Sequence, residues 1–153
     1  MIAPAKHVPG ERPDGRPDAR DARLRKHGDY QRVYKAARKQ PGSAMTWFFA
    51  DRVASGSIAP SETPRVGLTV GKVLGKAHER NRIKRRMRAA VRMHLDVLPV
   101  GVDLILHPRR QVMTIEFGKL EGEVLRIFRQ AAAQARQIAL ARAGASSLPE
   151  QGV

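Results

Sequence analysis

The spacing of apolar residues predicts a helix near each end of the chain. In the first, apolar residues recur at positions i, i+3, i+4 and i+7, which are Tyr30, Val33, Tyr34 and Ala37. Asp29 precedes them and is a residue type that favours the N-cap of a helix. The second helix is predicted from Phe117 to about Ala143, with an apolar face formed by Leu120, Val124, Ile127, Phe128, Ala131, Ala135 and Ile138.

Three segments between these helices have the pattern of β-strands. Residues 45–53 (MTWFFADRV) are rich in aromatic residues, which favour strands. In residues 65–71 (RVGLTVG) apolar residues alternate with Gly67, Thr69 and Gly71. The two glycines leave one face of that strand shallow, which suits a groove or a close contact. Residues 102–106 (VDLIL) form a short, mostly apolar run that is typical of a buried strand.

From about Glu79 the pattern changes to that of a third helix, between the second and third strands. With Ile83 at the centre of its buried face, the other residues on that side are Met87, Ala90, Val91 and Leu95. Polar residues within roughly 40° of the opposite pole are Asn81, Arg85, Arg88 and Arg92. Arg82 and Lys84 lie on the two flanks. The polar side of this helix is therefore almost purely cationic.

This order of elements predicts a single-domain α+β sandwich. We expect a small mixed sheet of about four strands, three of them visible in the pattern, with three helices and a strand–basic helix–strand crossover. Residues 1–22 are rich in Pro, Gly, Asp and Arg and predict a disordered N-terminal arm. Residues 23–143 would form the folded domain, and residues 144–153 a flexible tail.

The chain of 153 residues has a formal net charge of +15. Such an excess usually indicates a polyanionic partner, which is DNA, RNA or an anionic membrane surface. The sequence contains no cysteine, which excludes disulfides and fits a reducing cytoplasm. No apolar run approaches the ~20 residues of a membrane span, and the first residues lack the apolar core of a secretory signal.

The basic helix favours nucleic acid among these partners. An ordinary solvated helix mixes Glu with Lys, because oppositely charged pairs at i,i+4 stabilise it. Here Arg85 and Arg88, and Arg88 and Arg92, place like charges at i,i+3 and i,i+4, at a cost of a few tenths of a kcal/mol per pair. An anion lying on this face would offset that cost. A lipid surface is disfavoured because the opposite face of the helix is needed for the core.

The stretch from residue 65 to residue 88, RVGLTVGKVLGKAHERNRIKRRMR, closely resembles the signature of the bacterial ribonuclease P protein component. The family has a strand of the form Arg-x-Gly-Leu-x-Val, found here at residues 65–70 and followed by Lys72. A short loop then leads to an Arg-Asn-Arg helix, found here at residues 80–82. The resemblance covers about residues 23–140. Two departures are Val73, where a second lysine is frequent, and the His107-Pro108 pair, where a small residue and a basic one are more usual.

This resemblance implies a left-handed crossover and a function in RNA processing. The family's protein is the small subunit of a ribonucleoprotein endoribonuclease that removes the 5′ leader of precursor tRNA. The RNA subunit supplies the active site with bound Mg²⁺, so no catalytic or metal-binding side chain is expected here. The implied partners are ribonuclease P RNA and precursor tRNA in the cytoplasm, with no membrane and no obligate protein partner. The expected RNA-binding residues are Lys72, Lys76, Arg80, Asn81, Arg82, Lys84, Arg85, Arg88 and Arg92.

Tyr30 and Tyr34 allow two interpretations. Their spacing alone fits packing in the core. The resemblance implies instead that aromatic residues of the first helix and the first strand line a groove for the leader. Unpaired bases stack on such aromatic side chains. The strand aromatic is then expected at Phe48, with Trp47 or Phe49 in its place if the register slips by one residue.

A self-contained nuclease site is not indicated, because the acidic residues form no motif. Asp51, Glu79, Asp96, Asp103 and Glu116 are isolated in the sequence. The remaining alternative is a ribosomal protein or RNA chaperone, which would share the charge but would not need an aromatic pair beside a sheet groove.

Overall fold

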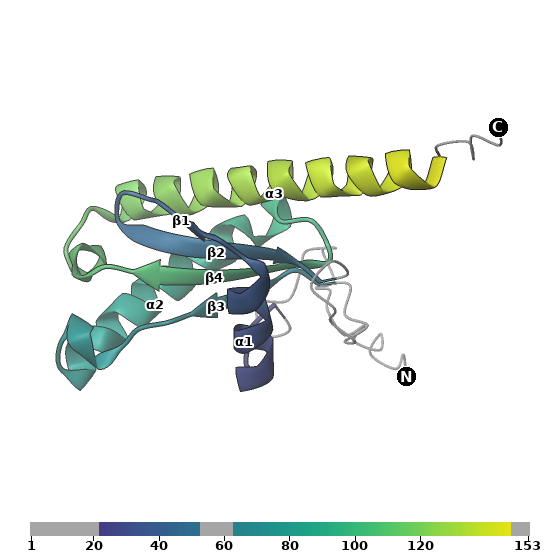
Figure 1. Ribbon diagram of the computed structural model, residues 1–153. Helices are drawn as coiled ribbons and strands as arrows, with labels where there is room; N and C mark the ends of the chain where they lie inside the picture. The colour runs from purple at the N-terminus through teal and green to yellow at the C-terminus, as the bar shows by residue number, and fades with distance from the viewer. Residues whose placement is uncertain (1–21, 53–62, 148–153) are drawn as a thin grey trace, which may run out of the picture.

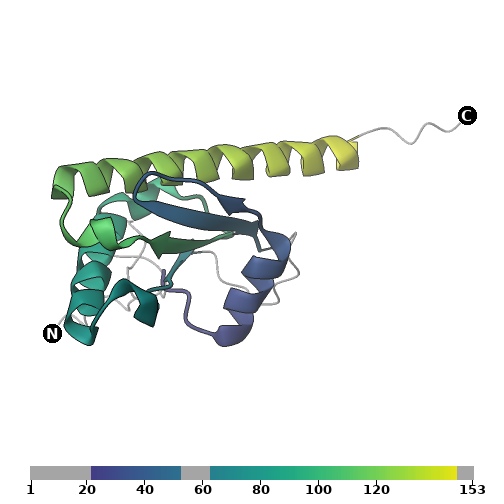
Figure 2. The ribbon, with the colours of Figure 1, turned by 60° about the vertical axis from the view of Figure 1, so that its left-hand side comes forward.

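The computed structural model describes residues 22–52 and 63–147, which form a four-stranded mixed sheet with helices on both faces (Figures 1 and 2). The elements are α1 (His27–Ala36), β1 (Lys39–Gln40), β2 (Met45–Asp51), β3 (Arg65–Leu68), α2 (Ala77–His94), β4 (Val102–Pro108) and α3 (Phe117–Ser147), with short 3₁₀ turns at Lys72–Leu74, Leu95–Val97 and Arg110–Met113. The strand order is β1-β2-β4-β3. β3 runs parallel to β4, and the other pairs are antiparallel. The predicted α+β sandwich and its parallel crossover through the basic helix are confirmed.

The alternation of side chains along β2 divides the interior into two clusters. Met45, Trp47 and Phe49 point into the larger cluster, which is completed by the apolar faces of α2 and α3. Phe48 and Ala50 point the other way, toward α1. α1 therefore lies on the face of the sheet opposite α2 and α3, and the C-terminal part of α3 extends past the sheet (Figures 1 and 2).

A buried ionic cluster holds α1 on its face of the sheet. The Asp103 carboxylate on β4 is fully buried and accepts hydrogen bonds from Arg52 Nε at 2.9 Å and from Arg65 Nε and Nη2, both at 2.9 Å. Arg32 of α1 also pairs with Asp103, and Asp29 of α1 pairs with both Arg32 and Arg65. Burial lowers the pKa of Arg52, and the Asp103 carboxylate opposes this effect. Buried charges are tolerated only when paired in this way.

This cluster explains one wrong prediction about α1. Asp29 does not cap the helix, because the N-cap position is Lys26, which makes no side-chain capping bond. The carboxylate of Asp29 lies in the first helical turn and is taken by Arg32 and Arg65. Tertiary ion pairing has thus replaced the local cap.

The boundaries of the central elements also differ from the prediction. β1 has only two residues, too few to show a strand pattern, and β3 ends at Leu68. α2 begins at Ala77 because the carboxylate of Glu79 accepts a hydrogen bond from the Lys76 backbone N–H, at 3.1 Å, and so closes the first turn.

The folded part of the chain extends slightly beyond the predicted domain at both ends. Ala22 was assigned to the arm, but it is buried and its carbonyl accepts the Val66 N–H at 2.7 Å. At the other end α3 continues to Ser147, where a flexible tail was predicted from residue 144. The rest of the predicted arm (residues 1–21 of 1–22) and of the predicted tail (residues 148–153 of 144–153) lies outside the described residues. None of the helices in the described ranges has the length and apolarity needed to cross a membrane.

Candidate RNA-binding surfaces

The first candidate surface is the outward side of α2. Ile83, Met87 and Ala90 are completely buried, so the helix is rotated as the sequence predicted. The exposed residues on its other side are Asn81, Arg82, Arg85, Arg88 and Arg92. We call these five residues the α2 cationic face. Within residues 22–52 and 63–147 none of their side chains forms a hydrogen bond or an ion pair, so their polar groups are available to a ligand.

Glu79, the one acidic residue of α2, is bound by neighbouring groups at the start of the helix. Besides accepting the Lys76 N–H, Glu79 forms an ion pair with Arg110 at 3.0 Å. The hydrogen bond from Lys76 and the charge of Arg110 lower the pKa of Glu79. Lys72 and Lys76 are exposed on the segment that leads into the helix, so the positive surface continues beyond its N-terminus.

Three basic residues of α2 are less open than the α2 cationic face. Arg86, which was not predicted as an RNA contact, donates to the carbonyls of Val112 and Ile115 and so ties α2 to the segment before α3. Arg80 is half-buried, and its Nε is enclosed without a hydrogen-bond partner among the described residues. Lys84 is half-buried on the flank.

The second candidate surface is a cluster of three rings on the α1 side of the sheet. Tyr34 of α1 meets Phe48 of β2 edge to face, with ring centroids 5.0 Å apart, and lies 5.7 Å from the ring of His107 on β4. Phe48 and His107 are 5.1 Å apart. The Tyr34 hydroxyl lies 2.8 Å from His107 Nε2 and 3.0 Å from Thr69 Oγ1. We call Tyr34, Phe48 and His107 the aromatic cluster.

Sheet register explains why these rings meet. Phe48 lies opposite Ile105 and Thr46 opposite His107, so Phe48 and His107 share one face as diagonal neighbours. Trp47 and Phe49 point to the other face and are buried. Phe48 is therefore the aromatic residue of β2 that faces α1, and its contact with a leader stays a prediction.

Tyr30 is placed differently from Tyr34. Its ring packs over Gly67, where an added Cβ would lie 2.6 Å from the tyrosine hydroxyl. Of the two predicted possibilities, a groove or a close contact, the close contact is present at Gly67, whereas Gly71 lies beyond the end of β3 with open space beside it. The hydroxyl can donate to the carbonyls of Leu24, at 3.2 Å, and Leu68, at 3.4 Å, and burial raises the pKa of Tyr30. The two tyrosine rings are 6.4 Å apart, so Tyr30 extends the aromatic cluster toward the edge strand.

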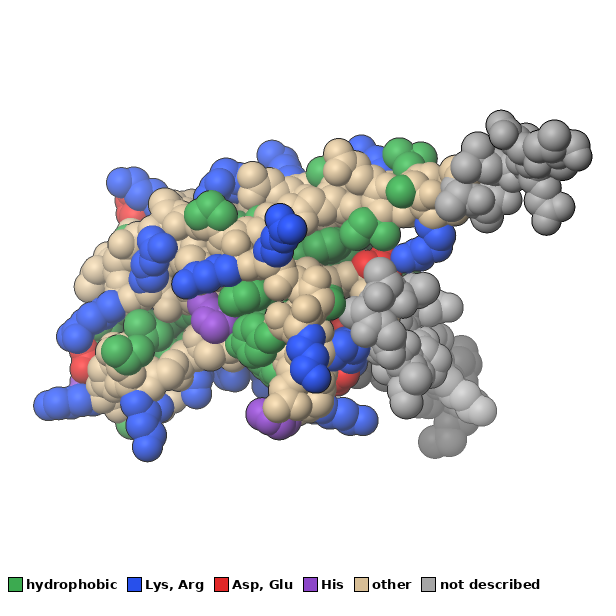
Figure 3. All heavy atoms as spheres, in the orientation of Figure 1, with side chains coloured by type: hydrophobic (Ala, Val, Ile, Leu, Met, Phe, Trp, Pro, Cys, Tyr) green, Lys and Arg blue, Asp and Glu red, His purple; other side chains and the backbone are tan. Residues whose placement is uncertain are grey.

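The aromatic cluster is surrounded by positive charge. Figure 3 shows hydrophobic side chains beside a histidine between α1 and the sheet, with Lys and Arg side chains around them. Lys39 of β1 pairs directly with Phe48 across the strands. Burial, and then the charge of Lys39, lower the pKa of His107, which favours its neutral form.

His107 was not predicted as a site residue. The sequence marks it only as a departure from the family's pattern. The two-residue period of β4 could have placed His107 on the same face of the sheet as Ile105 and Asp103. His107 becomes part of the aromatic cluster only because Tyr34 of α1 and Phe48 of β2 pack against it.

Acidic residues do not assemble into a metal centre in the described part of the chain, where no three His, Asp or Glu side chains come together. Asp29 and Asp103 belong to one cluster, although they are far apart in sequence, and guanidinium groups occupy both carboxylates.

Comparisons with known proteins agree with the signature in α2 and β3. The family model described as Ribonuclease P matches residues 19–132. A ribonuclease P protein component of Chloroflexus aggregans is 34% identical over 112 residues, covering 71% of this chain and 76% of the relative. A second one, from Herpetosiphon aurantiacus, is 35% identical over 112 residues and covers 73% of this chain and 85% of the relative.

Solved structures show the same fold. A mutant RNase P protein of Staphylococcus aureus has a TM-score of 0.61 at 22% identity, covering 73% of this chain and 89% of the other. The RNase P protein of Thermotoga maritima has a TM-score of 0.59 at 23% identity, covering 71% of this chain and 96% of the other. With the sequence matches, these findings show that the chain belongs to the ribonuclease P protein family.

Proposed function

We propose that this chain is the protein subunit of ribonuclease P and assists removal of the 5′ leader from precursor tRNA. The α2 cationic face binds the RNA subunit, with Lys72, Lys76, Arg80 and Lys84 around it. The aromatic cluster, extended by Tyr30, binds the leader. Membership of the family supports a role within an endoribonuclease.

The observation that carries this proposal is the presence of two chemically different surfaces on one small domain. The α2 cationic face offers arginines that pair with nothing else among the described residues, which suits a phosphate backbone. The aromatic cluster offers rings beside Lys39, which suits unpaired bases. α1 and α2 lie on opposite sides of the sheet, so one RNA can be held on each side.

We further propose that the RNA subunit carries out the cleavage, with Mg²⁺ held chiefly by that RNA and by the substrate. The engagement of acidic side chains in structural roles supports this division of labour. Asp103 and Asp29 pair with arginines, and Glu79 pairs with Arg110 and the start of α2. A cytoplasmic location is proposed from the absence of cysteine in the sequence.

Reconstitution tests the proposed function. The full chain is added to a bacterial ribonuclease P RNA at a low Mg²⁺ concentration at which the RNA alone cleaves precursor tRNA slowly. We expect faster release of the 5′ leader with the chain present. With an Arg85→Gln variant, more protein should be needed to reach the same rate. Arg129→Gln makes the same charge change at an exposed position of α3 and should behave as wild type. No acceleration by the folded wild-type chain would contradict the proposal.

A further inference from the structure

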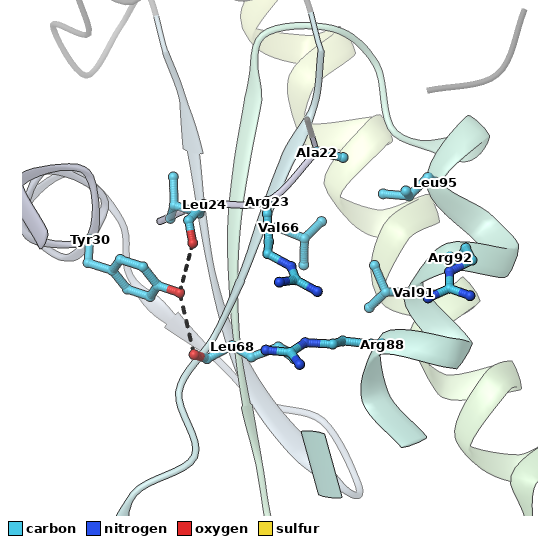
Figure 4. Close-up of a pocket in the computed structure, with 10 residues that line it drawn as sticks. All are labelled: Ala22, Arg23, Leu24, Tyr30, Val66, Leu68, Arg88, Val91, Arg92 and Leu95. Atoms are coloured by element: carbon cyan, nitrogen blue, oxygen red, sulfur yellow. Dashed lines mark hydrogen bonds between the residues drawn. The ribbon is translucent and has the colours of Figure 1, made fainter. Parts of the chain in front are cut away.

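A small pocket lies between the N-terminal segment Ala22–Leu24, β3 and α2 (Figure 4). The segment runs along the outer edge of β3, where Arg23 pairs with Val66. The pocket has a volume of about 100 Å³. A water needs only about 10–15 Å³ of such volume, so there is room for several waters or one small planar group.

Part of the pocket wall is apolar. Ala22, Val66 and Leu95 are buried, and Leu68 and Val91 present half-buried side chains to the open space. Apolar walls gain little from holding water, because water finds few hydrogen-bond partners there. This part of the wall is therefore suited to the flat face of a ring.

Three arginines form the polar part of the pocket lining. In Figure 4 the guanidinium groups of Arg23 and Arg88 reach into the space between β3 and α2 from opposite sides, and Arg92 follows one turn after Arg88. Within the part of the chain that the structure describes, no carboxylate pairs with any of the three. Burial and the nearby charges of Arg88, Arg25 and Arg92 lower the pKa of Arg23. Convergence of like charges without an anion is unfavourable until an anion binds.

Tyr30 helps to hold together the pocket wall formed by the N-terminal segment and β3. Its hydroxyl lies within hydrogen-bonding distance of the carbonyls of Leu24 and Leu68, which belong to the N-terminal segment and to β3 (Figure 4). Two backbone bonds, Leu24 N–H to Val66 O at 3.1 Å and Val66 N–H to Ala22 O at 2.7 Å, hold the same wall. The pocket is thus formed before any ligand arrives, which reduces the entropic cost of binding.

We propose that this pocket receives one unstacked nucleotide of the bound RNA, with its base against Val66 and Val91 and its phosphate on Arg23 and Arg88. The inference rests on the proposed function, because Arg88 and Arg92 also belong to the α2 cationic face. Splayed-out bases are bound by apolar or arginine surfaces, and arginine binds phosphate through paired N–H groups. A free phosphate would use the arginines but not the apolar walls. An apolar peptide would use the walls but would leave three cations unpaired.

Because the sequence contains no cysteine, a single introduced thiol can report on the pocket. Val91→Cys places it in the wall, and Leu140→Cys places a control thiol on α3, where Leu140 is 65% exposed. The rate of alkylation by iodoacetamide is measured for the full-length variants with adenosine 5′-monophosphate, adenosine or inorganic phosphate at equal concentrations. If circular dichroism shows that Val91→Cys does not fold, Leu68→Cys replaces it.

We expect adenosine 5′-monophosphate to slow alkylation of the pocket thiol about threefold at twice its dissociation constant, and to leave the control thiol unaffected. Adenosine and phosphate alone should protect less. Adding Arg23→Gln should remove most of the protection, whereas adding Arg129→Gln should not. Equal rates with and without the nucleotide would overturn the proposal, as would equal protection by phosphate alone, which would indicate an anion site without base binding.

Failure of this inference can be separated from failure of the proposed function. Arg85 is exposed on α2 and does not line the pocket. If Arg85→Gln weakens binding to ribonuclease P RNA while the nucleotide gives no protection, the pocket proposal is wrong and the proposed function stands.

Discussion

Phe48 of β2 meets Tyr34 of α1 edge to face, with ring centroids 5.0 Å apart and an interplanar angle of 87°. In such a pair the ring that presents its edge keeps both of its own faces away from its partner. Tyr34 is 36% exposed, although it packs against two other rings. Phe48 is partly buried against the core, whereas Tyr34 keeps exposed surface on which a base could stack. That these rings bind the leader stays a prediction.

The buried ionic cluster around Asp103 predicts a large loss of stability when its central carboxylate is removed. Asp103→Asn would leave the guanidinium groups of Arg52 and Arg65 without their shared buried carboxylate. We expect the free energy of unfolding to fall by about 3–5 kcal/mol, measured by urea denaturation. Asp96→Asn, at an exposed position, is the matched control and should change it by less than about 0.5 kcal/mol. Similar small effects of both substitutions would show that the cluster does not hold α1 in place.

His107 predicts how stability depends on pH. Because burial and Lys39 lower its pKa below 6.5, the unfolded chain takes up a proton at a higher pH than the folded chain. The stabilising contribution of the neutral ring is complete above pH 6.5 and is lost as the pH falls toward the lower pKa of the folded state. Urea denaturation from about pH 7.5 to about pH 5.5 should show His107→Gln losing less stability than wild type.

A control separates this effect from the general repulsion of a highly positive chain at low pH. His27→Gln removes a histidine at an exposed position of α1 and should leave the pH dependence of wild type unchanged. If His107→Gln and wild type lose stability in parallel over this range, the ring of His107 does not titrate as its surroundings indicate.

The α2 cationic face predicts a change in salt dependence. Arg85→Ala should weaken binding to ribonuclease P RNA without loss of folding, because the side chain is exposed opposite the buried Ile83. Each phosphate contact removed should reduce the slope of log affinity against log salt by about one. Filter binding at several salt concentrations measures this slope. An unchanged affinity together with an unchanged slope would place the RNA elsewhere on the protein.

The sequence predicted the features that depend on periodicity. The 3.6-residue period around Ile83 gave the correct rotation of α2, and the two-residue period of β2 placed Phe48 apart from Trp47. It could not reveal the ionic cluster, because Asp103 meets Arg65 only after β3 and β4 have paired, and Asp29 meets Arg65 only after α1 has packed on the sheet. The hand of the crossover stays a prediction from the family resemblance.

The most direct measurement of the central claim compares precursor tRNA with mature tRNA. Both affinities are measured for the chain reconstituted with ribonuclease P RNA, using wild type, Tyr34→Ala and Phe48→Ala. Tyr34→Phe tests the hydroxyl. Phe117→Ala is the matched control, because Phe117 is a half-buried aromatic residue of α3 on the other face of the sheet. Folding of every variant is checked first by circular dichroism.

We predict that each alanine substitution in the aromatic cluster weakens precursor binding by about 1–3 kcal/mol for each base stack lost, with little change for mature tRNA, which has no leader. Tyr34→Phe should be mild, and Phe117→Ala should not alter the ratio of the two affinities. Folded Tyr34→Ala and Phe48→Ala variants that lose affinity equally for both tRNAs, or for neither, would contradict the account.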